Sequence, residues 1–117
     1  MKKVIILILV SVIMLSACTN NNLNGNEIDL KEFNQCLADS GLVIYGSEWC
    51  PACKALVETL GGDDKVKPVY VECTTNQEIC EENKKTNYVP EIQFNGEVYE
   101  GHRTLEALSQ LTGCKLY

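Results

Sequence analysis

The chain contains little that would serve a metal centre or a nucleic-acid surface. Among its 117 residues there is a single histidine, His102, which we expect on the surface. A zinc site would need further histidines or a second closely spaced cysteine pair, so we expect no metal and no other cofactor. Basic residues are also scarce, because 10 Lys and Arg face 16 Asp and Glu and the net charge is −6. This acidic balance disfavours nucleic acid as a partner.

Long hydrophobic runs are absent as well. The longest one, residues 4–15, is interrupted at Ser11 and is too short to span a membrane comfortably. It follows Lys2-Lys3 and precedes Leu15-Ser16-Ala17-Cys18, so residues 1–17 are predicted to be a secretory signal peptide. The last four residues resemble the bacterial lipobox, which implies that Cys18 carries a diacylglyceryl group and becomes the mature N-terminus. The alternative is an ordinary signal peptide that ends before a cysteine.

A polar segment follows the predicted lipidation site. We interpret residues 18–27 as Cys18 and a flexible tether, and residues 28–117 as one folded domain. The mature chain would keep 8 basic against 16 acidic residues, a charge near −8. We therefore expect an extracytoplasmic protein anchored to the cell membrane by lipid. Thr19 supplies no acidic retention signal, so in a cell with two membranes the outer membrane is a second location to consider for the anchored protein.

Seven cysteines in a chain of this length indicate an oxidising compartment. Setting Cys18 aside leaves an even number, which permits complete pairing. Six cysteines allow 15 connectivities, and the sequence does not choose among them. The six are Cys36, Cys50, Cys53, Cys73, Cys80 and Cys114.

The motif Trp49-Cys50-Pro51-Ala52-Cys53 lies where an apolar, β-prone segment, residues 42–46, gives way to helical spacing over residues 52–60. Cys50 is therefore predicted at a helix N-terminus, where unpaired N–H groups and the helix dipole favour a thiolate. Cys53, one turn later, would be the resolving cysteine. Glu48 acts in the opposite direction, because a nearby carboxylate disfavours a thiolate. The competing interpretation of the pair as half of a zinc site lacks a second half.

The remaining pattern predicts an α/β domain. Helical spacing, capping residues and glycine stops predict a first helix from Asp29 to Gly41, a helix over 76–85 and a last helix over 104–111. Strands are predicted at 42–46 and 66–72 and as a hairpin, 91–94 and 97–99, around Asn95-Gly96. The order is helix, strand, helix, strand, helix, strand, strand, helix.

This order, the Cys50 motif, the Val89-Pro90 pair before the hairpin and Gly101 after it resemble the thioredoxin superfamily. The resemblance implies a four-stranded mixed sheet flanked by helices, without the optional first strand. It implies that Pro90 is cis and faces the active-site disulfide, and that the Val89 backbone pairs with an extended substrate. We expect Trp49 to be a partly exposed ring that covers the disulfide, rather than part of the core. Ile44 stands where thioredoxins carry a buried acid, which disfavours a general reductase.

A narrower resemblance runs through Tyr70-Val71-Glu72-Cys73, Cys80, Val89-Pro90-Glu91-Ile92 and Leu105-Glu106-Ala107-Leu108. These segments are similar to the thioredoxin-like domain that accompanies bacterial vitamin K epoxide reductase homologues. The resemblance implies a membrane reductase that passes electrons to quinone and, because this chain lacks the four-helix membrane domain, a separate protein as that partner. Cys73 and Cys80 would form either a structural disulfide or a relay pair.

Cys36 and Cys114 fall on the first helix and after the last one. In thioredoxin folds these helices lie on opposite faces of the sheet, which disfavours a bridge unless the tail after Gly113 wraps round an edge. Cys36 would otherwise be a buried thiol. The leading hypothesis is an oxidoreductase that oxidises thiols of exported proteins. The alternatives are an extracytoplasmic reductase, for instance in cytochrome maturation, and a non-enzymatic metal- or protein-binding lipoprotein.

Overall fold

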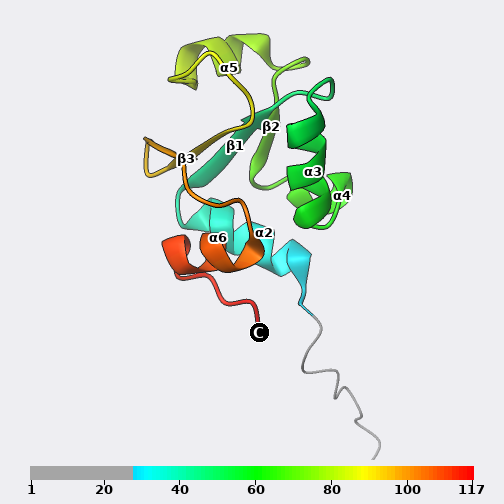
Figure 1. Ribbon diagram of the computed structural model, residues 1–117, viewed down its shortest axis with the longest axis vertical. Helices are drawn as coiled ribbons and strands as arrows, with labels where there is room; N and C mark the ends of the chain where they lie inside the picture. Colours follow the sequence, from blue (N-terminus) through cyan, green and yellow to red (C-terminus); the bar gives the residue numbers. More distant parts are fainter. Residues whose placement is uncertain (1–27) are drawn as a thin grey trace, which may run out of the picture.

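The computed structural model describes residues 28–117 (Figure 1). In chain order its elements are α2 (Leu30–Asp39), β1 (Leu42–Gly46), α3 (Pro51–Thr59), α4 (Asp63–Val66), β2 (Tyr70–Glu72), α5 (Gln77–Asn83), β3 (Glu91–Phe94), β4 (Glu97–Tyr99) and α6 (Leu105–Thr112). The predicted signal peptide 1–17, Cys18 and the tether lie outside the described residues. Within residues 28–117, no helix combines the length and the apolar character that crossing a membrane would require.

The four strands form one mixed sheet in the order β2-β1-β3-β4. β1 pairs in parallel with β2 and antiparallel with β3, which in turn pairs antiparallel with β4. The hairpin turn uses Asn95 and Gly96, both with positive φ, as the Asn-Gly signal predicts. This is the four-stranded sheet of the thioredoxin-like fold expected from the sequence.

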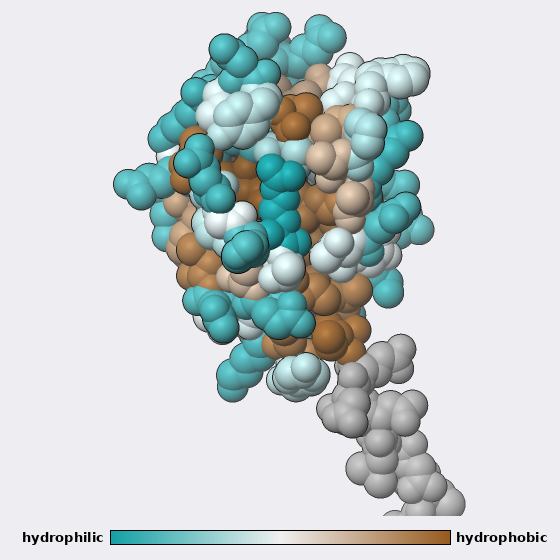
Figure 2. Space-filling view, viewed as in Figure 1, coloured by the Kyte–Doolittle hydropathy of each residue, from teal (hydrophilic) through white to brown (hydrophobic). Residues whose placement is uncertain are grey.

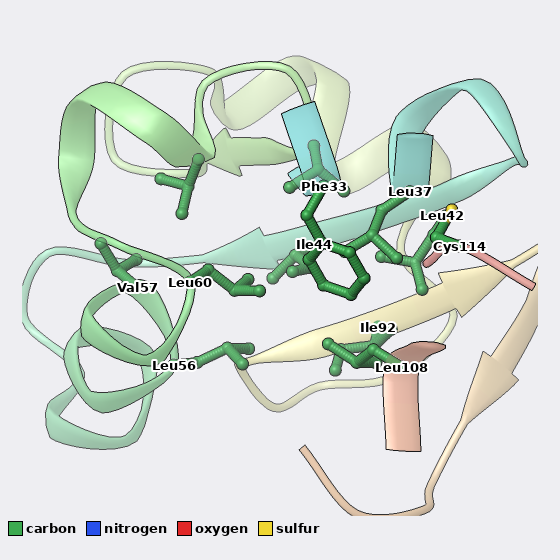
Figure 3. Close-up of a cluster of buried hydrophobic side chains, with 12 residues drawn as sticks. Phe33, Leu37, Leu42, Ile44, Leu56, Val57, Leu60, Ile92, Leu108 and Cys114 are labelled. Carbon is green, nitrogen blue, oxygen red and sulfur yellow. The ribbon is translucent and has the colours of Figure 1, made fainter. Parts of the chain in front are cut away.

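Successive side chains of each strand point alternately to the two faces of the sheet. Ile44 and its β3 partner Ile92 lie on the face that packs against α2, α3 and α6, where Phe33, Leu56, Leu60 and Leu108 join them (Figure 3). Tyr45 and its partner Glu91 lie on the other face. The Gln93 amide on that face donates to the Asn83 carbonyl, so the end of α5 contacts the second face.

The sequence-based placement of the first and last helices on opposite faces is wrong. Phe33 and Leu37 of α2 belong to the same buried cluster as Leu108 of α6 (Figure 3), and Figure 1 shows the two helices side by side. Cys36 and Cys114 form a disulfide, with an S–S distance of 2.10 Å. Cys36 is exposed rather than a buried thiol, because the Phe33 and Leu37 side of α2 takes the core.

The strand predicted over residues 66–72 is shorter in the structure. Gly61 and Gly62 both have positive φ, and after them Asp63 and Asp64 start the short helix α4, where acidic side chains suit the N-terminal dipole. β2 therefore begins only at Tyr70. The buried Asn34 amide of α2 donates to the carbonyls of Leu60 and Lys65, at 2.9 and 2.8 Å, and so holds this connection against the core.

The other helices match their predicted ends within three residues. Asp29 caps α2 by accepting from the N–H groups of Lys31 and Glu32, and Thr104 caps α6 by accepting from Ala107. The surface in Figure 2 is mostly hydrophilic around α5, whereas apolar residues gather toward the α2 and α6 end.

Candidate active site

Cys50 is the N-cap residue of α3, and Pro51 occupies the first helical position. Its backbone is extended, with φ −98° and ψ 114°, so its side chain turns back over the first turn of the helix. There the Cys50 Sγ accepts a hydrogen bond from the Cys53 N–H at 3.2 Å. A sulfur held at orphan N–H groups and the positive end of a helix is in the environment that favours a thiolate.

The two motif cysteines differ in exposure. Cys50 is half-buried, Cys53 is fully buried at 0%, and both are free thiols. Burial, followed by a hydrogen bond with Cys50, raises the pKa of Cys53 to about 11. Of these two sulfurs, that of Cys50 is therefore open to molecules outside the protein, whereas that of Cys53 is enclosed by the protein.

The Val89-Pro90 bond is cis, as the resemblance implied. Val89 lies directly against the motif, because the Cys50 thiol donates to its carbonyl at 3.6 Å. Pro90 is buried and Val89 is half-buried. Segments 39 residues apart thus meet at the Cys50 sulfur, and the Val89 backbone forms one wall of the site.

Polar side chains hold the loop that carries Val89. The Lys84 ammonium donates to the carbonyls of Thr86 and Tyr88. The Glu91 carboxylate, which is completely buried, accepts from the N–H groups of Lys85 and Thr86, the Thr86 hydroxyl and the Gln93 amide. Burial raises the pKa of Glu91, but these hydrogen bonds outweigh it, so the pKa is lower than usual and the carboxylate stays charged. Sequence reasoning missed this role, because nothing in the local pattern marks Glu91 as buried.

Glu72 ties the loop before Cys50 to the end of β2. Its carboxylate accepts from the N–H of Glu48, at 3.0 Å, and from the hydroxyl of Thr74, at 2.8 Å. The Cys73 N–H donates to the Gly46 carbonyl at 2.8 Å, which joins the same two loops a second time. Both links are contacts between distant segments, so sequence reasoning missed them.

Beside these loops is an open cavity of about 340 Å³, lined by Lys54 and Glu58 of α3, by Tyr70 and Glu72 of β2, and by Ser47 and Glu48. Tyr70 fills the space over Gly46: a Cβ added to Gly46 would lie 2.0 Å from the Tyr70 hydroxyl oxygen. The glycine thus makes room for the phenol at the end of β1.

Trp49 has 80% of its surface exposed, so it is excluded from the core and is more open than the partly covered ring we expected. His102 is exposed, as predicted. The exposed Tyr88 stands two residues before Pro90 and donates to Glu100 at 3.1 Å. Trp49 and Tyr88 are thus two exposed aromatic side chains in the loops next to Cys50 and Pro90.

Cys73 and Cys80 form a disulfide with an S–S distance of 2.09 Å, Cys80 being buried in α5. In this form neither sulfur is free to bind a metal. Among residues 28–117, no group of three or more histidine, cysteine and acidic side chains is arranged to hold a metal ion. Cys50 and Cys53 are thus the two free thiols among residues 28–117, and the other four cysteines of this part of the chain are paired.

The family model for glutaredoxin matches residues 42–99, from the start of β1 to the end of β4. This segment contains the Cys50 motif, the Cys73–Cys80 disulfide and the cis-proline. The chain therefore carries a glutaredoxin-like domain of the thioredoxin superfamily. Together with the free Cys50 and Cys53 thiols, this match supports a thiol oxidoreductase in general terms.

Proposed function

We propose that the protein is a membrane-anchored, extracytoplasmic oxidoreductase that oxidises thiols of exported proteins. The observation that carries the redox part is the pairing of a reachable Cys50 sulfur at the N-terminus of α3 with a buried Cys53 one turn away. The location rests on the sequence before the domain, where the predicted signal peptide, residues 1–17, ends directly before Cys18. Two disulfides besides the reactive pair fit an oxidising compartment.

The reaction begins with the Cys50–Cys53 disulfide. A substrate thiolate attacks the Cys50 sulfur, the bond between Cys50 and Cys53 breaks, and its electron pair goes to Cys53. A second substrate thiolate then attacks its partner sulfur in the mixed disulfide and releases Cys50. The substrate leaves with one new disulfide, and the protein keeps two electrons and two protons as two thiols.

The Val89 backbone is the expected docking line for the substrate. Val89 adjoins the Cys50 sulfur through its carbonyl, and Pro90 fixes the loop behind it. An extended peptide paired with Val89 would bring its cysteine next to Cys50, as in strand addition at an open edge. Trp49 is the exposed residue directly before Cys50, and its ring would contact the same peptide.

The reduced pair must be reoxidised. We propose a membrane protein similar to vitamin K epoxide reductase as the partner that passes the electrons to quinone. Cys73–Cys80 would be the relay between the two, since the Cys73 N–H and the Glu72 carboxylate already connect its loop to Gly46 and Glu48 beside the active site. If Cys73→Ser with Cys80→Ser left the rate of reoxidation by such a partner unchanged, the disulfide would be structural.

The test of direction is the reduction potential of Cys50–Cys53, measured by equilibration with glutathione. A potential near or above about −180 mV supports a donor of disulfides, and one near about −270 mV supports the alternative, an extracytoplasmic reductase. Cys53→Ala should accumulate mixed disulfides between Cys50 and exported proteins, and Cys50→Ala should not. A cell phenotype that survives both substitutions would favour a non-enzymatic binding lipoprotein.

A further inference from the structure

Cys53 has to exist as a thiolate at one point of the proposed cycle, yet its surroundings oppose that. It is completely buried and its pKa is about 11, because burial, the neighbouring Cys50 and the Glu72 charge all raise it. A backbone hydrogen bond from Ser47 acts in the opposite direction and lowers this pKa. Ile44 contributes no acid from β1, since it is an apolar side chain within the core.

Tyr70 brings a polar group to this place. It pairs with Ile44 in the parallel part of the sheet, and paired residues of parallel strands point to the same face, which here is the one that α3 covers. Its hydroxyl extends over Gly46, 2.0 Å from where a Cβ would stand. The Cys53 sulfur contacts the backbone of Ser47, the residue after Gly46, and it also interacts with the Tyr70 phenol, so the phenol and that sulfur are neighbours.

The phenol is in its neutral form. Burial first, then the negative charge that Cys53 would carry, raise the pKa of Tyr70 far above its ordinary value. A neutral phenol next to a sulfur can donate its O–H, and a hydrogen bond to an ionised group is stronger than one to a neutral group. The remaining charges near Cys53 come from Glu72 of β2 and from Cys50 at the N-cap of α3, and both are negative when ionised.

We propose that the Tyr70 hydroxyl donates a hydrogen bond to the Cys53 thiolate and thereby stabilises it as leaving group and as nucleophile. The catalytic role of this hydrogen bond rests on the proposed function, but the hydrogen bond itself can be measured without it. When the substrate thiolate opens the Cys50–Cys53 disulfide, the electron pair moves to the Cys53 sulfur, and Tyr70 holds that charge without giving up its own proton. Water later supplies the proton that converts the thiolate into the thiol. In the reverse direction, the same hydrogen bond favours the thiolate that attacks Cys50.

The experiment is a pH titration of Cys53 by thiolate ultraviolet absorbance. It uses the full chain with Cys18→Ser and Cys50→Ser and with both disulfides intact, so that Cys53 alone titrates as a thiol. Tyr70→Phe should raise the pKa of Cys53 so that the thiolate fraction at a given pH falls about tenfold. Tyr45→Phe is the matched control, because Tyr45 points to the other face of the sheet beside Glu91 and should leave that pKa unchanged. Equal pKa values in the two variants would overturn the proposal.

A second measurement avoids dependence on the folding of Tyr70→Phe. In the same Cys50→Ser chain with tyrosine labelled at the ring carbon that bears the hydroxyl, the carbon NMR signal of Tyr70 should shift as Cys53 ionises. A signal that stays constant through that titration would also overturn the proposal. Failure of the proposed function would look different. The oxidised wild-type chain would then not react with thiols of exported proteins, whereas the Cys53 titration would still respond to Tyr70→Phe.

Discussion

Cys36 of α2 and Cys114 beyond the end of α6 are joined by a disulfide that closes a loop with a sequence separation of 78. The bridge joins α2 to the last segment of the chain, which follows α6. The helices α2 and α6 both pack on the face of the sheet that carries α3. The bridge stands apart from Cys50 and Cys53, because it links α2 to the segment after α6 rather than the loops at Cys50. Cys114 is buried, so this sulfur is protected from solvent thiols, whereas Cys36 is exposed.

We expect Cys36→Ala with Cys114→Ala to lower the free energy of unfolding by about 2–4 kcal/mol, since the bridge restricts the unfolded chain. The comparison variant is Cys73→Ala with Cys80→Ala, which opens a loop with a separation of only 7. According to the chain-entropy relation, the bridge that closes the longer loop should stabilise the folded state by about 2 kcal/mol more than the other bridge. Chemical denaturation of both variants checks this. A larger loss from the shorter loop would contradict the entropic origin of the effect.

The features predicted from the sequence are those with local causes. Asp29 and the glycine at position 41 bound α2, Asn95-Gly96 specifies its hairpin, and the apolar residues 42–46 form β1 with the predicted ends. The position of Cys50 at a helix N-terminus also followed from neighbouring residues. Each of these signals operates over a few residues, so one chain suffices to detect it.

The features missed depend on contacts between distant segments. The Cys36–Cys114 bridge required knowing that α2 shares a face with α6, which the spacing of apolar residues does not specify. Tyr70 and Gly46 are 24 residues apart, and their fit appears only once β2 lies beside β1. Glu72 was missed for the same reason. A glutamate is expected on the surface, but this one accepts a hydrogen bond from the distant Glu48 N–H.

The fit between Gly46 and Tyr70 yields a second prediction. In Gly46→Ala the new Cβ would lie 2.0 Å from the hydroxyl oxygen and 2.6 Å from the ring carbon that bears it, so the phenol must move. We expect a loss of about 1–3 kcal/mol in the free energy of unfolding and an altered pKa of Cys53. With Tyr70→Val in the background, the added methyl group should cost much less, which a double-mutant cycle by denaturation measures.

Gly101→Ala is the matched control for this substitution. Its Cβ would lie 2.4 Å from the hydroxyl oxygen of Tyr99, so a similar clash occurs after β4, away from Cys53. We expect Gly101→Ala to reduce stability but to leave the pKa of Cys53 unchanged. A change in that pKa of the same size in both variants would show that it reports general loosening and not the position of Tyr70.

The third prediction concerns Glu72. Glu72→Gln removes a negative charge that raises the pKa of Cys53, so that pKa should fall. It also weakens the acceptor for the Glu48 N–H, so that amide should exchange its hydrogen faster. Thiol titration and hydrogen exchange test the two effects separately. Glu58→Gln is the control, because Glu58 lines the same cavity and loses the same charge. An equal fall in the pKa for both variants would mean that the effect is not specific to the Glu72 position.

The fourth prediction concerns Glu91 and acid. Its pKa is lowered in the folded protein, so its contribution to stability is present above the unfolded pKa, about 4.3, and is lost as the pH falls through the folded value. Glu91→Gln should reduce the free energy of unfolding at neutral pH by about 1–3 kcal/mol, because the partly buried N–H groups of Lys85 and Thr86 lose a charged acceptor. The free energy of unfolding of this variant should also depend less on pH in acid, because the substituted side chain no longer titrates. Glu97→Gln, at an exposed position of β4, should change neither the stability at neutral pH nor its dependence on acid.

The same substitution bears on the active site. Glu91 follows Pro90 and accepts from the loop that presents Val89, so Glu91→Gln should loosen the wall beside Cys50 while leaving α3 intact. We expect slower formation of mixed disulfides with peptide thiols but an unchanged rate with a small thiol, because only the peptide needs the Val89 backbone. Stopped-flow measurements with both reactants separate the cases. Equal slowing of the two reactions would place the effect on the Cys50–Cys53 pair itself and remove the reason to regard Val89 as a docking line.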